Sequence, residues 1–150
     1  HAIGEDILLL EIQQSSDVTY RFWDWGRLDK DGNPRELHVK KGLDVTDVSL
    51  HLEPCKGERL RAMGGTRVRY IEDKNFVLER LSVKGSMPLE VMPKRFRLLT
   101  ALCDGYLTEE GCTIKFKAGD SVFIPASAGR IKLECEGDLM LSYPGRMENA

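Results

Sequence analysis

Residues 105–124 read GYLTEEGCTIKFKAGDSVFI, and this stretch decides the fold class. Three short runs rich in β-favouring residues, Gly105–Thr108, Cys112–Lys117 and Asp120–Ile124, alternate with turn residues such as glycine and aspartate. Short β-rich runs separated by turns are typical of antiparallel strands. The stretch therefore predicts an all-β domain.

The same spacing extends on both sides of this stretch, from about residue 66 onward. Further strands are predicted at Arg67–Glu72, Phe76–Lys84, Arg95–Asp104, Gly129–Cys135 and Gly137–Tyr143. About eight short strands in about 80 residues predict a β-sandwich or a jelly roll.

The first third of the chain is less regular. Ile7–Gln13 and Thr19–Trp25 are predicted strands, and Asp29–Pro34 is a predicted turn because glycine and asparagine accept a positive φ. Residues 36–54 are charged and irregular, and they indicate a connection with a short helix near Val45. We expect a boundary near residue 50, which separates residues 1–49 from a C-terminal domain of residues 50–150.

Three residues in the predicted turn resemble the start of a calcium loop, because Asp29, Asp31 and Asn33 surround Gly32. The twelfth position of such a loop needs a glutamate that binds through both carboxylate oxygens, and here it would be Lys40. A hairpin turn is therefore the favoured interpretation.

Composition excludes several classes of partner. The 150 residues are 41% hydrophobic, with 22 basic and 24 acidic side chains and a net charge of −2. This balance predicts neither nucleic-acid binding nor attraction to an anionic membrane. No apolar run approaches the ~18 residues that a membrane span needs.

The cysteines and histidines give little sign of a metal site. The four cysteines form no CxxC pair, and we interpret them as buried, reduced thiols of a cytoplasmic protein. His51 and Glu53 would share one face of a strand, which suits two metal ligands, but a surface pair is the favoured interpretation. His38 follows Arg35, Glu36 and Leu37, and His1 has no preceding residues here from which to interpret it.

Residues 15–27 combine aromatic and charged side chains. If this segment is a strand, Arg21, Trp23, Trp25 and Arg27 lie on one face, which could bind a sugar or a phosphate. The alternative is structural: the tryptophans pack, and the two arginines pair with Asp17 and Asp24. The residues alone favour the structural alternative.

Several motifs together resemble the type I mannose-6-phosphate isomerases, in particular the short bacterial and archaeal members. The matching segments are His1–Gly4, Leu10–Gln13, Ser16–Asp17, Thr19–Arg21, Trp23–Trp25, Arg27–Asp29 and Pro34–His38. The resemblance is specific across residues 1–40, and beyond about residue 66 it rests on a similar layout.

The resemblance implies two cupin-type jelly-roll β-barrels. Residues 1–49 would then be terminal strands of a catalytic barrel plus a linker, with a zinc ion bound by Gln, His, Glu and His ligands. His1 corresponds to the last of these ligands, and the other three would precede this chain. The resemblance further implies a catalytic and substrate-binding role for Arg21, a catalytic role for Glu11, and a substrate-binding role for Asp17, which would also orient Arg21.

The C-terminal barrel departs from the cupin pattern. The segment from Gly119 to Pro125 resembles the second cupin motif, Gly-x5-Pro-x4-His, but Arg130 occupies the histidine position. Residues 66–115 contain no histidine, so the first motif is absent. We expect this barrel to hold no metal and to pack on the catalytic barrel of the same chain.

The expected function is part of an isomerase that interconverts mannose 6-phosphate and fructose 6-phosphate by zinc-assisted proton transfer through an enediol. The alternative is a non-catalytic cupin module that binds a sugar or regulates a partner. Upstream sequence with Gln-x-His and a later Glu would favour the enzyme. We expect the 150-residue chain by itself to be inactive, because it carries one of four zinc ligands.

Overall fold

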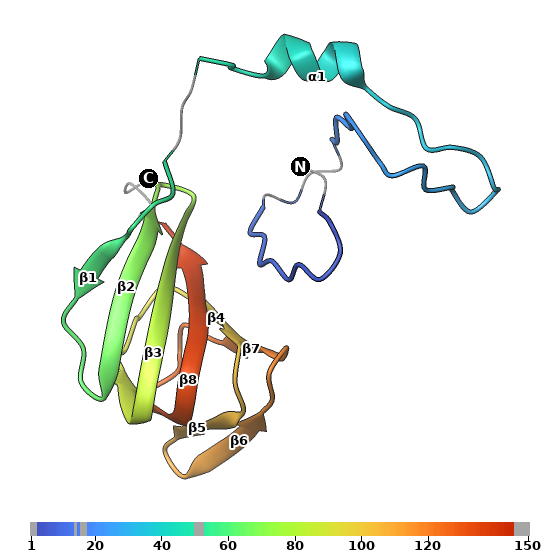
Figure 1. The fold of residues 1–150 in the computed structure, drawn as a ribbon. Helices are drawn as coiled ribbons and strands as arrows, with labels where there is room; N and C mark the ends of the chain where they lie inside the picture. The colour runs from blue at the N-terminus through green and yellow to red at the C-terminus, as the bar shows by residue number, and fades with distance from the viewer. Residues whose placement is uncertain (1–2, 14, 16–17, 50–52, 146–150) are drawn as a thin grey trace. The chain divides into compact units, whose positions relative to one another are not determined.

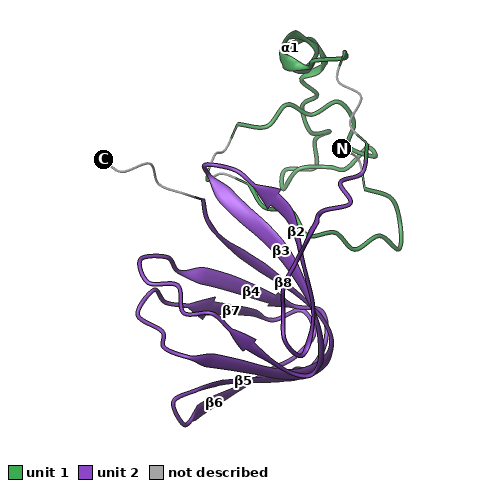
Figure 2. Ribbon diagram, turned by 90° about the vertical axis from the view of Figure 1, so that its left-hand side faces the viewer, with its two compact units in different colours: residues 1–53 green, residues 54–150 purple. Residues whose placement is uncertain are grey.

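The computed structural model describes residues 3–13, 15, 18–49 and 53–145. The chain divides into two compact units, residues 1–53 and residues 54–150 (Figure 2). Within the described ranges, the N-terminal unit holds one helix, α1 (Val39–Val45), and the C-terminal unit holds all the strands. No helix among these residues is long and apolar enough to cross a membrane.

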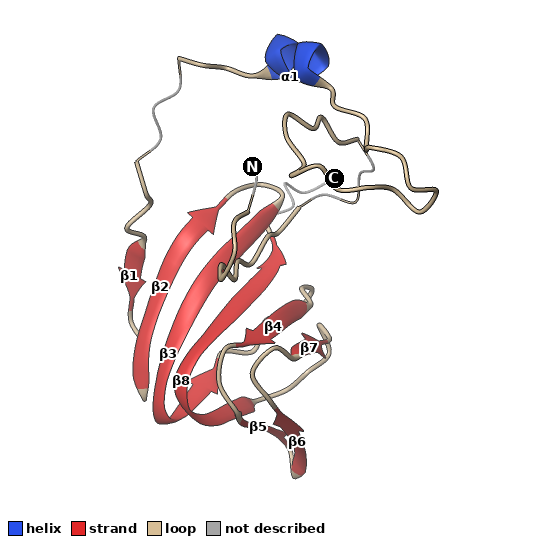
Figure 3. Cartoon of the chain, turned by 45° about the vertical axis from the view of Figure 1, so that its right-hand side comes forward, coloured by secondary structure: helices blue, strands red, loops and turns tan. Residues whose placement is uncertain are grey.

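The C-terminal unit is an antiparallel sheet of eight strands that curls over on itself (Figure 1, Figure 3). The hydrogen-bonded order is β1-β2-β3-β8-β4-β7, and the β5–β6 hairpin pairs with β8. The strands are β1 (Glu58–Leu60), β2 (Gly65–Glu72), β3 (Phe76–Leu89), β4 (Arg97–Ala101), β5 (Gly105–Glu109), β6 (Cys112–Phe116), β7 (Ser121–Ile124) and β8 (Ile131–Pro144). The prediction of an all-β fold is confirmed.

Strand β8 is the centre of the sheet. One edge pairs with β3 over 14 residues, from Leu89 opposite Ile131 to Phe76 opposite Pro144. The other edge pairs first with β5 and then with β4. A single strand therefore joins three others, where the sequence predicted two separate strands, 129–135 and 137–143.

The two predicted strands are one because Gly137 continues the strand instead of ending it. Its φ is +151°, and a Cβ at this position would lie 2.8 Å from the Cβ of Cys103. Cys103 lies in the connection between β4 and β5, so the glycine lies where the edge of β8 changes partner. Glycine here permits close approach of the neighbouring chain, a known role of glycine in strands.

Gly137→Ala is expected to lower the free energy of unfolding by about 2 kcal/mol, because the added methyl group collides with Cys103. The matched control is Gly111→Ala in the β5–β6 turn, where φ is +88° and no atom lies within 4 Å of the new Cβ. The control should lose about 1 kcal/mol through backbone strain alone. Urea unfolding followed by far-UV circular dichroism measures both, and equal losses would contradict the role given to Cys103.

The core lies inside the curl of the sheet and follows the period-two alternation of β3 and β8. Buried residues alternate with less buried ones along most of both strands. Leu81, Leu133 and Leu139 are fully buried, as are Leu99 and Ala101 of β4. Side chains from facing parts of the curled sheet thus form one apolar interior.

Some strand boundaries also differ from the prediction; β4, for example, is Arg97–Ala101 where a strand over 95–104 was predicted. β3 continues to Leu89 instead of ending at Lys84, although it includes Gly85 with φ +80° and Pro88. Glycine and proline usually end strands, but here pairing with β8 carries the strand past both. The short strand β1 was not predicted at all.

The strands predicted at 7–13 and 19–25 are wrong for this chain. Within the described residues of the N-terminal unit, the only β-pairing is an isolated bridge between Leu28 and Pro34. Asp24 to Arg27 form a tight turn in which Trp25 and Gly26 have φ of +54° and +66°, which interrupts any strand through Trp25. The preceding barrel to which these strands were assigned stays a prediction.

Two other predictions for the N-terminal unit are confirmed. Helix α1 lies where a short helix was expected, near Val45. Asp29 makes the predicted turn, because its Oδ1 atom accepts hydrogen bonds from the backbone N–H groups of Asp31 and Asn33, both at 2.9 Å. The Asp29 carboxylate therefore stabilises the turn, which agrees with a hairpin turn and not with a calcium loop.

All four cysteines are free thiols, but they are not all buried. Cys135 is buried, and burial is the main cause that raises its pKa to about 12. Cys55 and Cys112 are exposed, so the prediction of burial is wrong for these two.

Candidate functional site

The N-terminal unit contains a cavity of about 610 Å³ that brings together two of the residues to which the resemblance assigns a role. Glu11 and Arg21 both line it. The remaining lining comes from the two chain segments around them and consists of Gln13, Val18, Thr19, Tyr20, Phe22, Trp23 and Asp24. A carboxylate and a guanidinium at one cavity can serve as a proton-transfer group and an oxyanion partner.

Arg21 is held by the segment around His38. The backbone N–H of His38 donates to the Arg21 carbonyl at 2.7 Å, and the Arg21 N–H donates to Nδ1 of His38 at 3.3 Å. The Arg21 guanidinium donates through Nη1 to the Glu36 carbonyl at 3.2 Å. These contacts fix both the backbone and the side chain of Arg21.

Asp24 is the acidic partner of Arg21, with 3.8 Å between Nε and Oδ2. The same Oδ2 atom lies 3.2 Å from Nε of Arg35, so two arginines share one carboxylate. The structural alternative correctly paired Arg21 with an aspartate in this segment. It did not foresee Arg35, which lies 11 positions further along and has no local sequence signal.

The predicted face of Arg21, Trp23, Trp25 and Arg27 does not form. Arg21 and Trp23 line the cavity described above, whereas Trp25 and Arg27 line another one, with Ile3, Gly4 and Glu5. The cause is the turn at Asp24–Arg27, whose two central residues are Trp25 and Gly26, so that the chain reverses there.

The two tryptophan rings meet edge-on, with 6.2 Å between their centroids, and both side chains are 57% exposed. The interpretation of the tryptophans as packing residues is met by their contact with each other, and Trp23 also lines the cavity.

Several predicted residues lie outside the described part of the chain: His1, Asp17 and His51. Within the described ranges, no group of three or more His, Cys, Asp or Glu side chains could hold a metal ion. The described residues therefore do not fit a zinc ion by themselves. Arg130, at the histidine position of the second cupin motif, is exposed.

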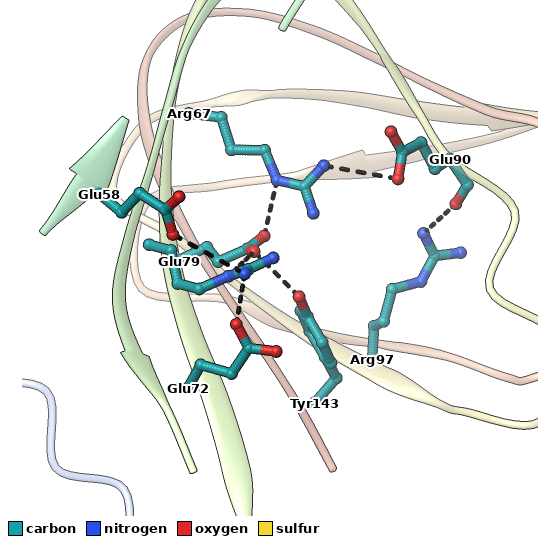
Figure 4. A network of polar contacts seen from close by, with 8 residues as sticks. Glu58, Arg67, Glu72, Glu79, Glu90, Arg97 and Tyr143 are labelled. Atoms are coloured by element: carbon teal, nitrogen blue, oxygen red, sulfur yellow. Dashed lines mark hydrogen bonds and ion pairs between the residues drawn. The ribbon is translucent and has the colours of Figure 1, made fainter. Parts of the chain in front are cut away.

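A second polar cluster lies inside the C-terminal unit and was missed by the sequence analysis (Figure 4). Glu79 of β3 is fully buried. Its carboxylate accepts hydrogen bonds from Nε of Arg67 at 2.7 Å, Nε of Arg69 at 3.1 Å and the hydroxyl of Tyr143 at 2.9 Å. One carboxylate thus connects β2, β3 and β8.

The surroundings of Glu79 shift the pKa values of its partners. Burial, followed by the negative charge of Glu79, raises the pKa of Tyr143. Burial acts to lower the pKa of Arg67, but the hydrogen bond and charge of Glu79 outweigh it and raise that pKa. Tyr143 therefore stays neutral and Arg67 stays charged.

The chain resembles known mannose-6-phosphate isomerases along most of its length. It is 33% identical over 144 residues to "Mannose-6-phosphate isomerase ManA" of Bacillus subtilis (strain 168) and 50% identical over 143 residues to "Mannose-6-phosphate isomerase" of Streptococcus mutans serotype c. Each match covers 95% of this chain and 45% of the relative. The chain thus spans somewhat less than half the length of these relatives.

Solved structures give the same result for the fold. The crystal structure of the mannose 6-phosphate isomerase from Bacillus subtilis matches with a TM-score of 0.73 and 26% identity, over 85% of this chain and 40% of that one. An RmlC-like cupin from Shewanella frigidimarina matches with a TM-score of 0.51 and 16% identity, over 62% of this chain and 87% of that one, which shows the fold alone. The predicted cupin fold is confirmed.

The family described as "Mannose-6-phosphate isomerase, cupin domain" matches residues 66–144, which run from β2 to the last residue of β8. This range contains the curled sheet apart from β1 and the first residue of β2. The chain therefore belongs to the mannose-6-phosphate isomerase cupin-domain family, as its sequence indicated.

Proposed function

We propose that this chain forms part of an isomerase that interconverts mannose 6-phosphate and fructose 6-phosphate. The family and the names of its relatives support this proposal, and the observation that carries it is the cavity lined by both Glu11 and Arg21. The ligand of that cavity would be a sugar phosphate in the cytoplasm.

In this proposal the two side chains have different tasks. The reaction moves a proton between C1 and C2 of the sugar through an enediol, so a base must accept and return it. Glu11 is the carboxylate at the cavity and takes this task. Arg21 stabilises negative charge on the substrate oxygen, and its contacts to Asp24 and Glu36 hold it in place before substrate binds.

A zinc ion is part of the proposal through His1 and three ligands expected upstream. When bound, such an ion supplies a Lewis acid that polarises the sugar carbonyl. In the same proposal the C-terminal unit would have a structural task, which is to pack on the catalytic barrel.

The proposal predicts turnover of mannose 6-phosphate by the complete protein that carries this chain, with loss of activity on removal of zinc. A coupled assay of fructose 6-phosphate formation, with and without a chelator, measures both effects. Re-addition of zinc should restore the rate, which controls for damage by the chelator. We expect the 150-residue chain alone to give no turnover.

A folded, zinc-loaded protein that does not convert the substrate would contradict the isomerase proposal. The runner-up is a non-catalytic cupin that binds a sugar or regulates a partner. Tight binding of the sugar phosphate without conversion, measured by calorimetry, would favour that function.

A further inference from the structure

Arg97 of β4 is a buried cation with no carboxylate of its own in the described part of the chain. Its side chain is 2% exposed. Nη1 donates to the backbone carbonyl of Glu90 at 2.8 Å, while Nε is buried and has no hydrogen-bond partner there. Burying a guanidinium without a counter-ion costs several kcal/mol, so a negatively charged group beside Arg97 would stabilise it.

The neighbouring charges do not supply that partner. Burial lowers the pKa of Arg97, and the positive charge of Arg67 lowers it further. Glu79, the buried carboxylate, is already shared by three other donors. Glu109 attracts Arg97 from a distance, but its Oε1 accepts a hydrogen bond from the backbone of Gly129.

Glu90 occupies the space toward which both arginines point (Figure 4). Its carboxylate is 78% exposed and lies 3.7 Å from Nη1 of Arg67, and Arg97 contacts its main chain only. An exposed, loosely paired carboxylate adds little stability. It can also move aside without leaving a buried group unpaired.

A cavity of about 380 Å³ lies beside Glu90, the residue that both arginines contact, although Arg97 itself is not among its lining residues. Its charged lining residues are Arg61, Arg67 and Glu90, and its apolar lining residues are Ala62, Met63, Leu81, Met87, Pro88 and Leu89. The cavity therefore combines a charged end with a mostly apolar wall, which suits a small organic anion.

We propose that the C-terminal barrel binds a small oxyanion, a phosphoryl or carboxylate group, at the Arg67 end of this cavity, where Arg97 joins it once the Glu90 side chain moves aside. The carbon part of the ligand occupies the cavity walled by Met87 and Leu89. Guanidinium groups are suited to such groups because their donors match two oxygens at once. This site lies in the C-terminal unit and is separate from the cavity of Glu11 and Arg21, so it does not depend on the proposed isomerase function.

The test is the binding of inorganic phosphate, and separately of acetate, to the complete protein, with sodium chloride at equal ionic strength as the reference. Calorimetry gives the dissociation constant. Arg97→Met removes the charge while keeping an unbranched chain, and we expect it to weaken binding at least tenfold. The matched control is Arg130→Met, an exposed arginine of the same unit, which should bind like the wild type.

The two anions distinguish the ligand classes. A response to phosphate alone assigns a phosphoryl ligand, and a response to acetate alone assigns a carboxylate. Without anion, Arg97→Met should unfold at the same or a higher temperature than the wild type, because it removes an unpaired buried charge. A lower melting temperature with unchanged anion binding would instead show a purely structural role and overturn the proposal.

A second measurement covers the case in which Arg97→Met does not fold. Titration of the wild type with phosphate, followed by NMR of the arginine Nε–H groups, should shift the Arg97 and Arg67 signals in a saturable way. No saturable shift with either anion would overturn the proposal. Isomerase activity enters neither measurement, so this proposal and the proposed function can fail independently.

Discussion

Replacing Arg21 with alanine is expected to lower kcat for mannose 6-phosphate by about a hundredfold to a thousandfold, the usual effect of removing one oxyanion-stabilising donor. The guanidinium lines the cavity with Glu11 and is held by Asp24 and the Glu36 carbonyl. Since the side chain is fixed before substrate binds, its contribution requires little reorganisation. Steady-state kinetics of the complete protein measure the effect.

The matched control is Arg27→Ala, which removes the same charge six positions away. Arg27 lines a different cavity, so its loss should leave kcat within about twofold of the wild type, as for a residue outside the site. Arg21→Lys keeps the charge but loses the planar fork, and should recover a part of the rate. An unchanged kcat in Arg21→Ala would contradict the role given to this residue.

Glu79→Ala is expected to lower the free energy of unfolding of the C-terminal unit by about 3–5 kcal/mol, the usual cost of removing one partner of a buried ion pair. The substitution leaves the guanidinium groups of Arg67 and Arg69 without this carboxylate and the Tyr143 hydroxyl without its acceptor. Urea unfolding followed by far-UV circular dichroism is the suitable measurement. Both tryptophans lie in the N-terminal unit, so fluorescence would report the wrong part of the chain.

Glu134→Ala is the matched control. Glu134 is also a strand carboxylate paired with a cation, Lys132, at 2.9 Å, but its side chain is 41% exposed. A pair of this kind should contribute at most about 1 kcal/mol. Similar losses in the two variants would show that the buried cluster adds no more than a surface ion pair.

The C-terminal strands could be predicted from the sequence because apolar and polar side chains alternate along them. Along β3 and β8, every second side chain enters the core, and this period is visible without a structure. The errors occurred at Gly85, Pro88 and Gly137, which local rules treat as strand ends. Hydrogen bonding between β3 and β8 continues both strands past these residues. The local sequence does not show which strands will pair.

The polar cluster was missed for the same reason. The alternation along β3 puts Glu79 on the same face as Val77 and Leu81, but the strand alone does not show which cations neutralise it. Only the register, which places Arg69 opposite Glu79, shows that the charges meet inside the sheet. Arg21 and Glu11 were predicted from the family resemblance, whereas Asp24 and Arg35 share a contact that no spacing rule contains.

The central place of β8 has a consequence for the order of folding. β3, β4 and β5 all pair with residues 131–144. During synthesis none of these strands can complete its pairing until β8, the last strand, has been made. The contacts between β3 and β8 join residues far apart in sequence, and such a high contact order slows folding. During synthesis β3 carries an unpaired edge over its whole length, and this nascent state is the one most exposed to aggregation and to chaperones.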